Sequence, residues 1–162
     1  MDASDTGVVP LDEALGQSGL SFLRGLIEGR YPVPPFAAVT DCRLTEATEG
    51  RAVFTGRPGT NFLNPLGGIH GGWTAGILDS AMACAVHTTL EAGAGYTTLE
   101  FRVHLVRGIL PTSGELTCEG RIVHRGGQTA TSEGFLRDGA GRLLAHGTET
   151  CLIFDARRAR RG

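Results

Sequence analysis

The sequence predicts an α+β domain in which one antiparallel β-sheet packs against a single long helix, with a shorter helix near the N-terminus. Two observations carry this prediction. An alanine-rich helical stretch occupies the middle of the chain, and alternating apolar and polar runs joined by short glycine turns fill the part that follows. Such runs are typical of antiparallel hairpins. One buried helix against such a sheet is an α+β arrangement.

The chain is expected to begin with a mobile or loosely docked lead-in, because residues 1–18 are acidic and weakly patterned. A helix is predicted over residues 20–27, where apolar residues recur at helical spacing before a proline-rich segment that must end it. Two strands are predicted next, over residues 36–44 and 51–56, with an acidic turn at residues 46–50 between them.

Residues 57–72 are predicted to form a loop, and the long helix to follow from Gly71 to about Leu90, where glycines end it. Four strands complete a single domain over residues 19–154, and an arginine-rich tail follows at residues 155–162. The four predicted strands cover residues 98–105, 115–124, 128–137 and 142–154.

Composition excludes several classes of function. All 15 basic residues are arginine, so a Walker phosphate-binding loop and a Schiff-base enzyme, which need lysine, are excluded. The net charge of −2 gives no field that would attract nucleic acid or an anionic membrane. The arginines at 157, 158, 160 and 161 are expected to form a solvated tail. Four well-separated cysteines, with no leader or transmembrane pattern, predict free thiols in a cytoplasmic protein. Scattered histidines predict no metal site.

The junction between the loop and the long helix carries the densest chemistry. Five glycines fall between residues 67 and 76. At a helix start, glycines allow a ligand to approach the unpaired backbone N–H groups, which suit a developing oxyanion. The alternative is a tight loop whose glycines only permit contact between helix and sheet.

Asp79 lies within the predicted helix, with Ala75, Gly76, Met82 and Ala83 as its neighbours one turn away. Burial on this small apolar face should raise the pKa of the carboxyl, which suits a general base or a nucleophile. A buried aspartate held by a loop hydrogen bond is the alternative. Gly71 and Asp79 are eight residues apart, roughly 12 Å along one helix. One reacting carbonyl cannot touch both, so a shared site needs two subunits and at least a dimer.

The segment Asn64-Pro65, Gly68, His70-Gly71-Gly72 and Asp79 resembles the signature of hotdog-fold acyl-CoA thioesterases of the PaaI-like (phenylacetic acid degradation) branch, in the 4-hydroxybenzoyl-CoA thioesterase superfamily. The resemblance spans roughly residues 20–154. It implies an antiparallel sheet wrapped around one helix, and hydrolysis of an acyl-CoA. Ala83 stands where some relatives have a hydroxyl residue. Some relatives also have a lysine in the turn expected to contact the nucleotide of coenzyme A, whereas the corresponding turn here, at residues 125–128, has none.

The resemblance also implies residue roles. Gly71 would polarise the thioester carbonyl through its N–H, and Asp79 of the other subunit would attack it or activate water. Asn64 would position the water or the acyl-enzyme, and His70 would support the site by hydrogen bonding. Thr98, with Thr97 as the near alternative, would orient water. The residues expected to contact substrate are Gly72, Trp73 and Met82 at the acyl end, and Arg125, Gly126, Gly127 and Gln128 at the nucleotide end.

The sequence therefore predicts a thioesterase that acts on an apolar aryl or medium-chain acyl-CoA. It is expected to form a homodimer, and two such dimers are expected to form a homotetramer. Coenzyme A is part of the substrate, and no separate cofactor is expected. Trp73 and Met82 could equally be core residues. A non-catalytic acyl-CoA sensor and a hotdog acyl-thioester dehydratase are the alternative functions.

Overall fold

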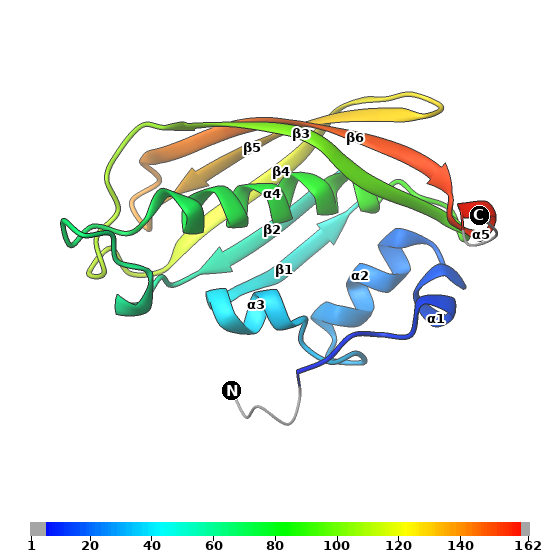
Figure 1. The fold of residues 1–162 in the computed structure, drawn as a ribbon, viewed down its shortest axis with the longest axis horizontal. Coiled ribbons are helices and arrows are strands. Elements are labelled where there is room, and N and C mark those ends of the chain that lie inside the picture. The colour runs from blue at the N-terminus through cyan, green and yellow to red at the C-terminus, as the bar shows by residue number, and fades with distance from the viewer. Residues whose placement is uncertain (1–5, 160–162) are drawn as a thin grey trace.

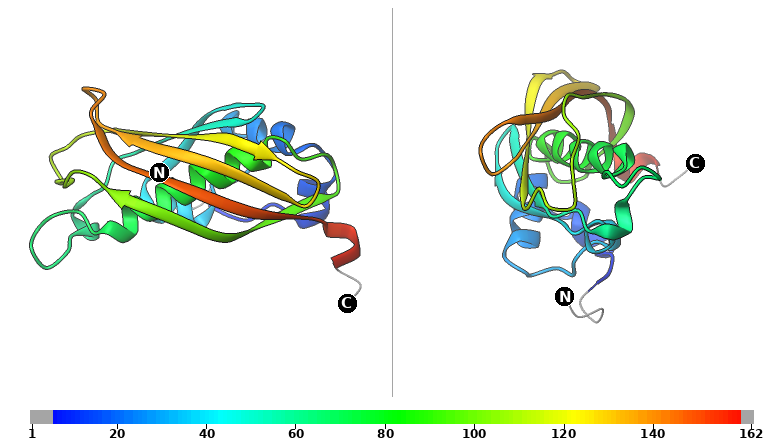
Figure 2. Two further views of the ribbon diagram at one scale, coloured as in Figure 1. Left: turned by 90° about the horizontal axis from the view of Figure 1, so that it is seen from above. Right: turned by 90° about the vertical axis from the view of Figure 1, so that its left-hand side faces the viewer.

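The computed structural model describes residues 6–159 and shows one six-stranded antiparallel sheet that curls around a long central helix, α4 (Figures 1 and 2). The strands lie in the order β1-β2-β4-β5-β6-β3. This arrangement confirms the α+β class and the hotdog fold. The strands are β1 (Cys42–Thr48), β2 (Arg51–Gly56), β3 (Ala94–Leu105), β4 (Leu116–Arg125), β5 (Thr129–Arg137) and β6 (Leu143–Asp155).

Three short helices precede the sheet, and they lie below it in Figure 1. α1 (Leu11–Leu15) falls within the expected lead-in, whose residues 1–5 lie outside the described part of the chain. α2 (Gly19–Ile27) confirms the predicted N-terminal helix. Its first residue approaches the end of α4 closely, because the Gly19 N–H donates to the Leu90 carbonyl at 2.9 Å.

The predicted strand over residues 36–44 is wrong in its first half, which forms α3 (Pro35–Thr40). Pro35 occupies the first helical position, where a fixed φ and a missing N–H favour a helix start. The Thr40 hydroxyl donates back to the Phe36 carbonyl at 2.7 Å. Asp41 then takes a left-handed conformation with φ 50°, which ends the helix and starts β1.

The predicted turn at residues 46–50 is also too long. β1 continues to Thr48, and only Glu49 and Gly50 remain between the strands. Gly50 has φ 75°, which suits a residue without Cβ. Glu46 lies in the strand and pairs with Arg51 across the hairpin at 2.7 Å.

α4 (Gly71–His87) lies so close to the sheet that the strands it packs against carry glycine at the points of contact. Gly120, Gly134 and Gly147 are directly paired across β4, β5 and β6. A Cβ at Gly120 would lie 2.1 Å from the Ala81 carbonyl oxygen of α4, and one at Gly134 would lie 2.8 Å from Met82. This glycine row serves close packing of helix on sheet, a use of glycine beyond the hairpin turns and the helix start that the sequence indicated.

The remaining elements match the predictions within a few residues. α4 ends at His87 rather than near Leu90, and β3 begins at Ala94 rather than Thr98. The chain ends its described part in α5 (Ala156–Ala159), and residues 160–162 of the predicted tail lie outside it. Within residues 6–159, no helix is long and apolar enough to cross a membrane.

Candidate functional site

The start of α4 is capped by His70, whose side chain and carbonyl accept hydrogen bonds from two of the first backbone N–H groups of the helix. The Gly72 N–H donates to His70 Nδ1 at 2.9 Å, and the Trp73 N–H donates to the His70 carbonyl at 3.0 Å. The first N–H of an α-helix has no carbonyl partner in the preceding turn. Gly71 is therefore the donor at this helix start that His70 leaves free for a ligand.

The loop before α4 is organised by Asn64. Its Oδ1 accepts from the Leu66 N–H at 2.9 Å and from the Gly68 N–H at 3.2 Å, an Asx-turn geometry. The Phe62 carbonyl accepts from the His70 N–H at 2.7 Å, which ties the loop to the helix cap. Asn64 thus shapes the loop through its oxygen and keeps its amide nitrogen as a donor.

Asp79 lies two turns along α4, on a half-buried part of the helix. Burial raises the pKa of its carboxyl above the ordinary value. This is the environment that the apolar neighbours predict. The straight helix from Gly71 to Asp79 also supports the separation of about 12 Å inferred from their spacing, so one subunit does not bring them together.

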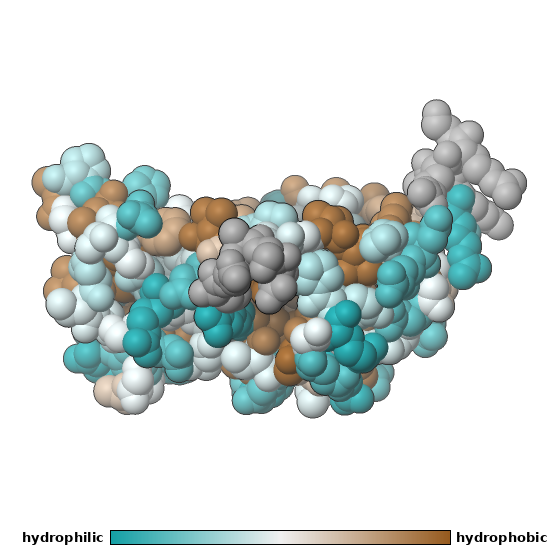
Figure 3. All heavy atoms as spheres, turned by 90° about the horizontal axis from the view of Figure 1, so that it is seen from below, coloured by the Kyte–Doolittle hydropathy of each residue, from teal (hydrophilic) through white to brown (hydrophobic). Residues whose placement is uncertain are grey.

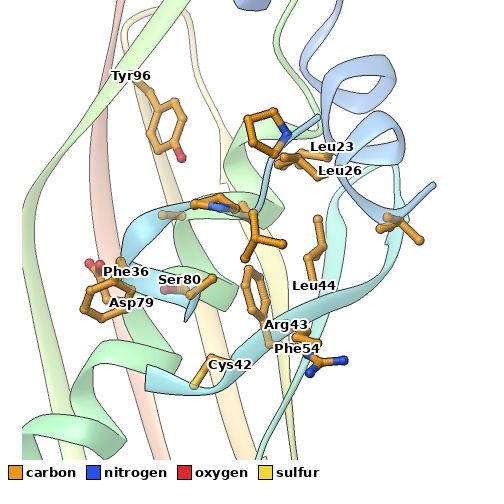
Figure 4. Close-up of a pocket in the computed structure, with 17 residues that line it drawn as sticks. Leu23, Leu26, Phe36, Cys42, Arg43, Leu44, Phe54, Asp79, Ser80 and Tyr96 are labelled. Carbon is orange, nitrogen blue, oxygen red and sulfur yellow. The ribbon is translucent and has the colours of Figure 1, made fainter. Parts of the chain in front are cut away.

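A cavity of about 390 Å³ opens beside Asp79. Figure 4 shows it between α4, the N-terminal helices and β1, with the Asp79 carboxylate next to the ring of Phe36. Phe36 packs on α4 at Gly76, where a Cβ would lie 2.8 Å from the ring. The walls are mainly apolar and include Leu23, Leu26, Ile27, Ala37, Leu44, Phe54, Ala83 and Tyr96.

The surface around the cavity is also partly apolar. The view from below shows hydrophobic patches near the middle of the molecule, with hydrophilic surface around them (Figure 3). Phe36 and Val39 of α3 are both more than half exposed. Among the described residues, Arg43 is the one cationic residue of the cavity wall, and its guanidinium lies 3.9 Å from the Asp41 carboxylate.

Two predicted substrate contacts lie in the core instead of the cavity wall. Trp73 is buried and donates its indole N–H to the Thr40 carbonyl at 2.8 Å. Met82 is fully buried between α4 and the sheet. The structure thus gives both side chains a packing role in this subunit. The apolar lining of the cavity comes from the N-terminal helices together with residues of β1, β2, β3 and α4.

The predicted nucleotide turn is the exposed β4–β5 hairpin connection. The Arg125 guanidinium donates to the Gly126 carbonyl, and the Gln128 carbonyl accepts from the Ile153 N–H at 2.7 Å. The turn lies at the opposite end of the protomer from the start of α4 (Figure 1). Gly71 and this turn are therefore separate in one subunit, as are Gly71 and Asp79.

Thr98 faces the inside of the sheet, whereas the alternative Thr97 is exposed. The Thr98 hydroxyl donates to Glu149 Oε1 at 2.7 Å. Thr97 pairs with Leu152, which is 36% exposed on the outer side of β6. Of the two threonines, Thr98 is the one placed to reach the space beneath α4.

Glu149 is the site residue that the sequence analysis missed. Its side chain is 2% exposed, and burial raises the pKa of its carboxyl to about 7, against the hydrogen bonds from Thr98 and Cys151, while the charge of Asp79 raises it further. The signal in the sequence is the strand period, because Glu149 is in phase with the buried residues Gly147 and Cys151. Acidic side chains are almost never fully buried unless they are paired, so an acid at an inward position of a strand indicates a specific role.

Among the described residues, no three histidine, cysteine, aspartate or glutamate side chains are grouped as a metal ion would need. The acidic pair of Asp79 and Glu149 is accompanied by cysteine and tyrosine side chains that burial keeps protonated. The pKa values of Cys84 and Cys151 rise to about 12, and that of Tyr96 rises well above its ordinary value.

Comparisons with known proteins agree with this fold. The family model described as the thioesterase superfamily matches residues 66–145. A phenylacetic acid degradation-related protein of Ralstonia eutropha JMP134 is 29% identical, with a TM-score of 0.73 over 80% of this chain and 98% of the other. No protein of curated function matches the chain in sequence.

Two further solved structures share the fold at lower identity. Escherichia coli PaaI, from the phenylacetic acid degradation operon, has a TM-score of 0.73 at 20% identity, over 85% of this chain and 96% of the other. A Haemophilus influenzae thioesterase has a TM-score of 0.69 at 16% identity, over 75% of this chain and 83% of the other.

Proposed function

Because the chain belongs, through residues 66–145, to the thioesterase superfamily, and is thus a thioester hydrolase, we propose that its substrates are acyl-CoA thioesters with an apolar acyl group. The observation that carries this proposal is the Asp79 carboxyl, whose pKa is raised by burial, at the wall of an apolar cavity. A carboxylate beside a cavity with few polar partners is suited to accept a proton or to attack a carbonyl.

The proposed reaction places the thioester carbonyl oxygen at the Gly71 N–H and the carbonyl carbon within reach of Asp79. Asp79 either attacks that carbon or takes a proton from the water that does. The C–S bond then breaks, and the coenzyme A thiolate leaves and takes up a proton. In the general-base route the free acid is released directly, whereas in the nucleophilic route water first hydrolyses the anhydride between Asp79 and the acyl group. Asn64 would donate through its amide nitrogen at the same loop. Both routes consume one water and yield a free acid and a thiol.

We propose that Gly71 and Asp79 of one site come from two subunits. β3 is an edge strand, and its exposed apolar residues support pairing with a second copy, since long apolar edges are normally covered. Leu99 is 58% exposed and Leu105 is 61% exposed. Such a dimer could also bring the turn at Arg125–Gln128 to the nucleotide end of the substrate, and two dimers would form the tetramer.

The acyl class follows from the cavity and from two of the similar proteins. A volume of about 390 Å³ falls within the usual range of small-ligand pockets, and its apolar wall suits an aryl or medium-chain group. The Ralstonia protein and E. coli PaaI are both named for phenylacetic acid degradation, which favours the aryl group. The four free cysteines fit the reducing cytoplasm that we propose as its location.

A thiol-release assay with aryl, medium-chain and dicarboxylic acyl-CoAs tests this proposal. We expect hydrolysis of the first two, and a loss of kcat of about 10²- to 10⁴-fold in Asp79→Asn, the usual contribution of a general base. Glu91→Gln, which changes an exposed carboxylate beyond the end of α4, is the matched control. The acidic limb of the kcat/KM profile should lie above the ordinary aspartate pKa, because Asp79 acts only when ionised.

Near-normal turnover in Asp79→Asn would contradict the role of this carboxylate. Tight binding of acyl-CoAs by the wild type without thiol release would indicate a sensor instead of an enzyme. Size-exclusion chromatography of both variants shows whether a loss of activity is a loss of assembly.

A further inference from the structure

The buried carboxyl of Glu149 is joined to the candidate site through a single hydroxyl. Its Oε1 accepts from the Thr98 hydroxyl at 2.7 Å and from the Cys151 thiol at 3.1 Å. Oε2 has no hydrogen-bond partner among the described residues, and neither has the buried hydroxyl of Ser132. Ser132 lies directly opposite Glu149 on β5.

This arrangement is costly as packing. A buried carboxyl with one oxygen unpaired destabilises a fold relative to an apolar side chain of similar size. The groups around it are Asp79 and Cys84 of α4, Tyr96 and Thr98 of β3, Ser132 of β5 and Cys151 of β6. None of these is a cation that would offset the charge. Packing alone therefore gives no reason for a carboxyl at this position.

The hydrogen bond does, however, fix the direction in which Thr98 can act. A hydroxyl has one proton and two acceptor lone pairs. Because the Thr98 proton is held by Glu149, the Thr98 oxygen can only accept from any further partner. An attacking water points a lone pair at the carbonyl carbon and donates one hydrogen to a base. Its other hydrogen is oriented if it meets a hydrogen-bond acceptor.

We propose that Glu149 is a positioning residue, which holds the proton of Thr98 so that the threonine oxygen accepts a hydrogen bond from the hydrolytic water. This inference rests on the proposed function. One water hydrogen passes to the Asp79 carboxylate, either directly in the general-base route or as that carboxylate is released from the anhydride in the nucleophilic route. The other hydrogen stays on the water oxygen and points to Thr98. The new C–O bond forms as the C–S or acyl–enzyme bond breaks.

The test compares variants that keep or remove the acceptor for the Thr98 proton. Glu149→Gln keeps an acceptor oxygen and should hold kcat within about threefold of wild type. Glu149→Met has similar size and no such acceptor, and it should lower kcat about 10- to 100-fold with little change in KM. Thr98→Val should have the same effect. A tenfold loss of kcat corresponds to one lost hydrogen bond of ordinary strength. Ser132→Ala, which removes a buried hydroxyl from the same inner face, is the matched control and should leave kcat unchanged.

A double-mutant cycle separates positioning from folding. If Glu149 acts through Thr98, adding Glu149→Met to Thr98→Val should lower kcat no further. An equal loss in both backgrounds would overturn the proposal, as would a normal kcat in Glu149→Met. If Glu149→Met does not fold, the proposal is tested with Thr98→Val and Thr98→Ser. The serine hydroxyl should restore the kcat that Thr98→Val loses, and a normal kcat in Thr98→Val would overturn the proposal. A wild type that hydrolyses no acyl-CoA overturns the proposed function itself, whereas these outcomes in an active enzyme overturn only the role of Glu149.

Discussion

Replacing Glu149 by glutamine should change how the stability of the fold depends on pH. Burial raises the pKa of this carboxyl from its ordinary value of 4.5 to about 7. At pH values between these two, the unfolded chain has lost the proton and the folded chain keeps it. The folded state is therefore destabilised as pH rises from 4.5 to about 7, and the effect is constant above that.

The size of the effect follows from the gap between the two pKa values. Each pKa unit corresponds to about 1.4 kcal/mol, so the gap between 4.5 and about 7 gives about 3 kcal/mol. Glutamine does not titrate and keeps most of the shape of the side chain. The free energy of unfolding of Glu149→Gln, minus that of the wild type, should thus rise by about 3 kcal/mol between pH 4 and pH 8.

Urea unfolding of both proteins across this range measures the difference. Protein concentration is held fixed, because subunit association contributes to apparent stability. Other groups titrate in both proteins and cancel in the difference, apart from Asp79, whose charge acts on Glu149. A difference that stays constant across the range would refute the reasoning, since it would mean that Glu149 ionises at its ordinary pKa in the folded protein.

Two further changes test the packing of α4. Gly120→Ala should lower the free energy of unfolding by about 3 kcal/mol or more, because its Cβ would lie 2.1 Å from the Ala81 carbonyl oxygen; Gly139→Ala, which meets nothing within 4 Å, is the control for thermal unfolding. His70→Ala should cost about 1 kcal/mol through the lost helix cap, whereas His70→Asn should retain most of it, and equal stability of the two variants would contradict the capping role.

The sequence predicted those parts of the fold that depend on local pattern. Period-two alternation located the last four strands, and small apolar residues located α4. The segment Phe36-Ala37-Ala38-Val39 was misassigned because its apolar, partly β-branched composition suits a strand. Pro35 at a helix start and the left-handed Asp41 decided the outcome, and these signals are weaker than composition when read along a chain.

The residues of the candidate site also differ in how far the sequence predicts them. Glycine clustering at the helix start singled out Gly71, and the small apolar helix face singled out Asp79. Asn64 and His70 received their expected roles only through the resemblance to hotdog-fold thioesterases. Trp73 and Met82 were not resolved between pocket and core, because α4 is apolar on nearly all sides.

Glu149 could not be grouped with Asp79 in advance. It is 70 residues further along the chain, and it meets Thr98 only through the pairing of β3 with β6. The register shift between Thr98 and Glu100 also changes which side chains of β3 face inward. Alternation alone does not predict such a bulge.

The glycine row beneath α4 has a consequence for motion. The Gly120 backbone lies against Ala81 with no side chain between them, so this part of the helix is packed rigidly on the sheet. The backbone of Asp79, two residues earlier, is fixed with it. For the substrates proposed above, acyl groups of different length would then be accommodated by the other wall of the cavity. That wall is α2 and α3, with Phe36 resting on Gly76, so adaptation to substrate belongs to the N-terminal helices, while the backbone that carries the carboxylate stays still.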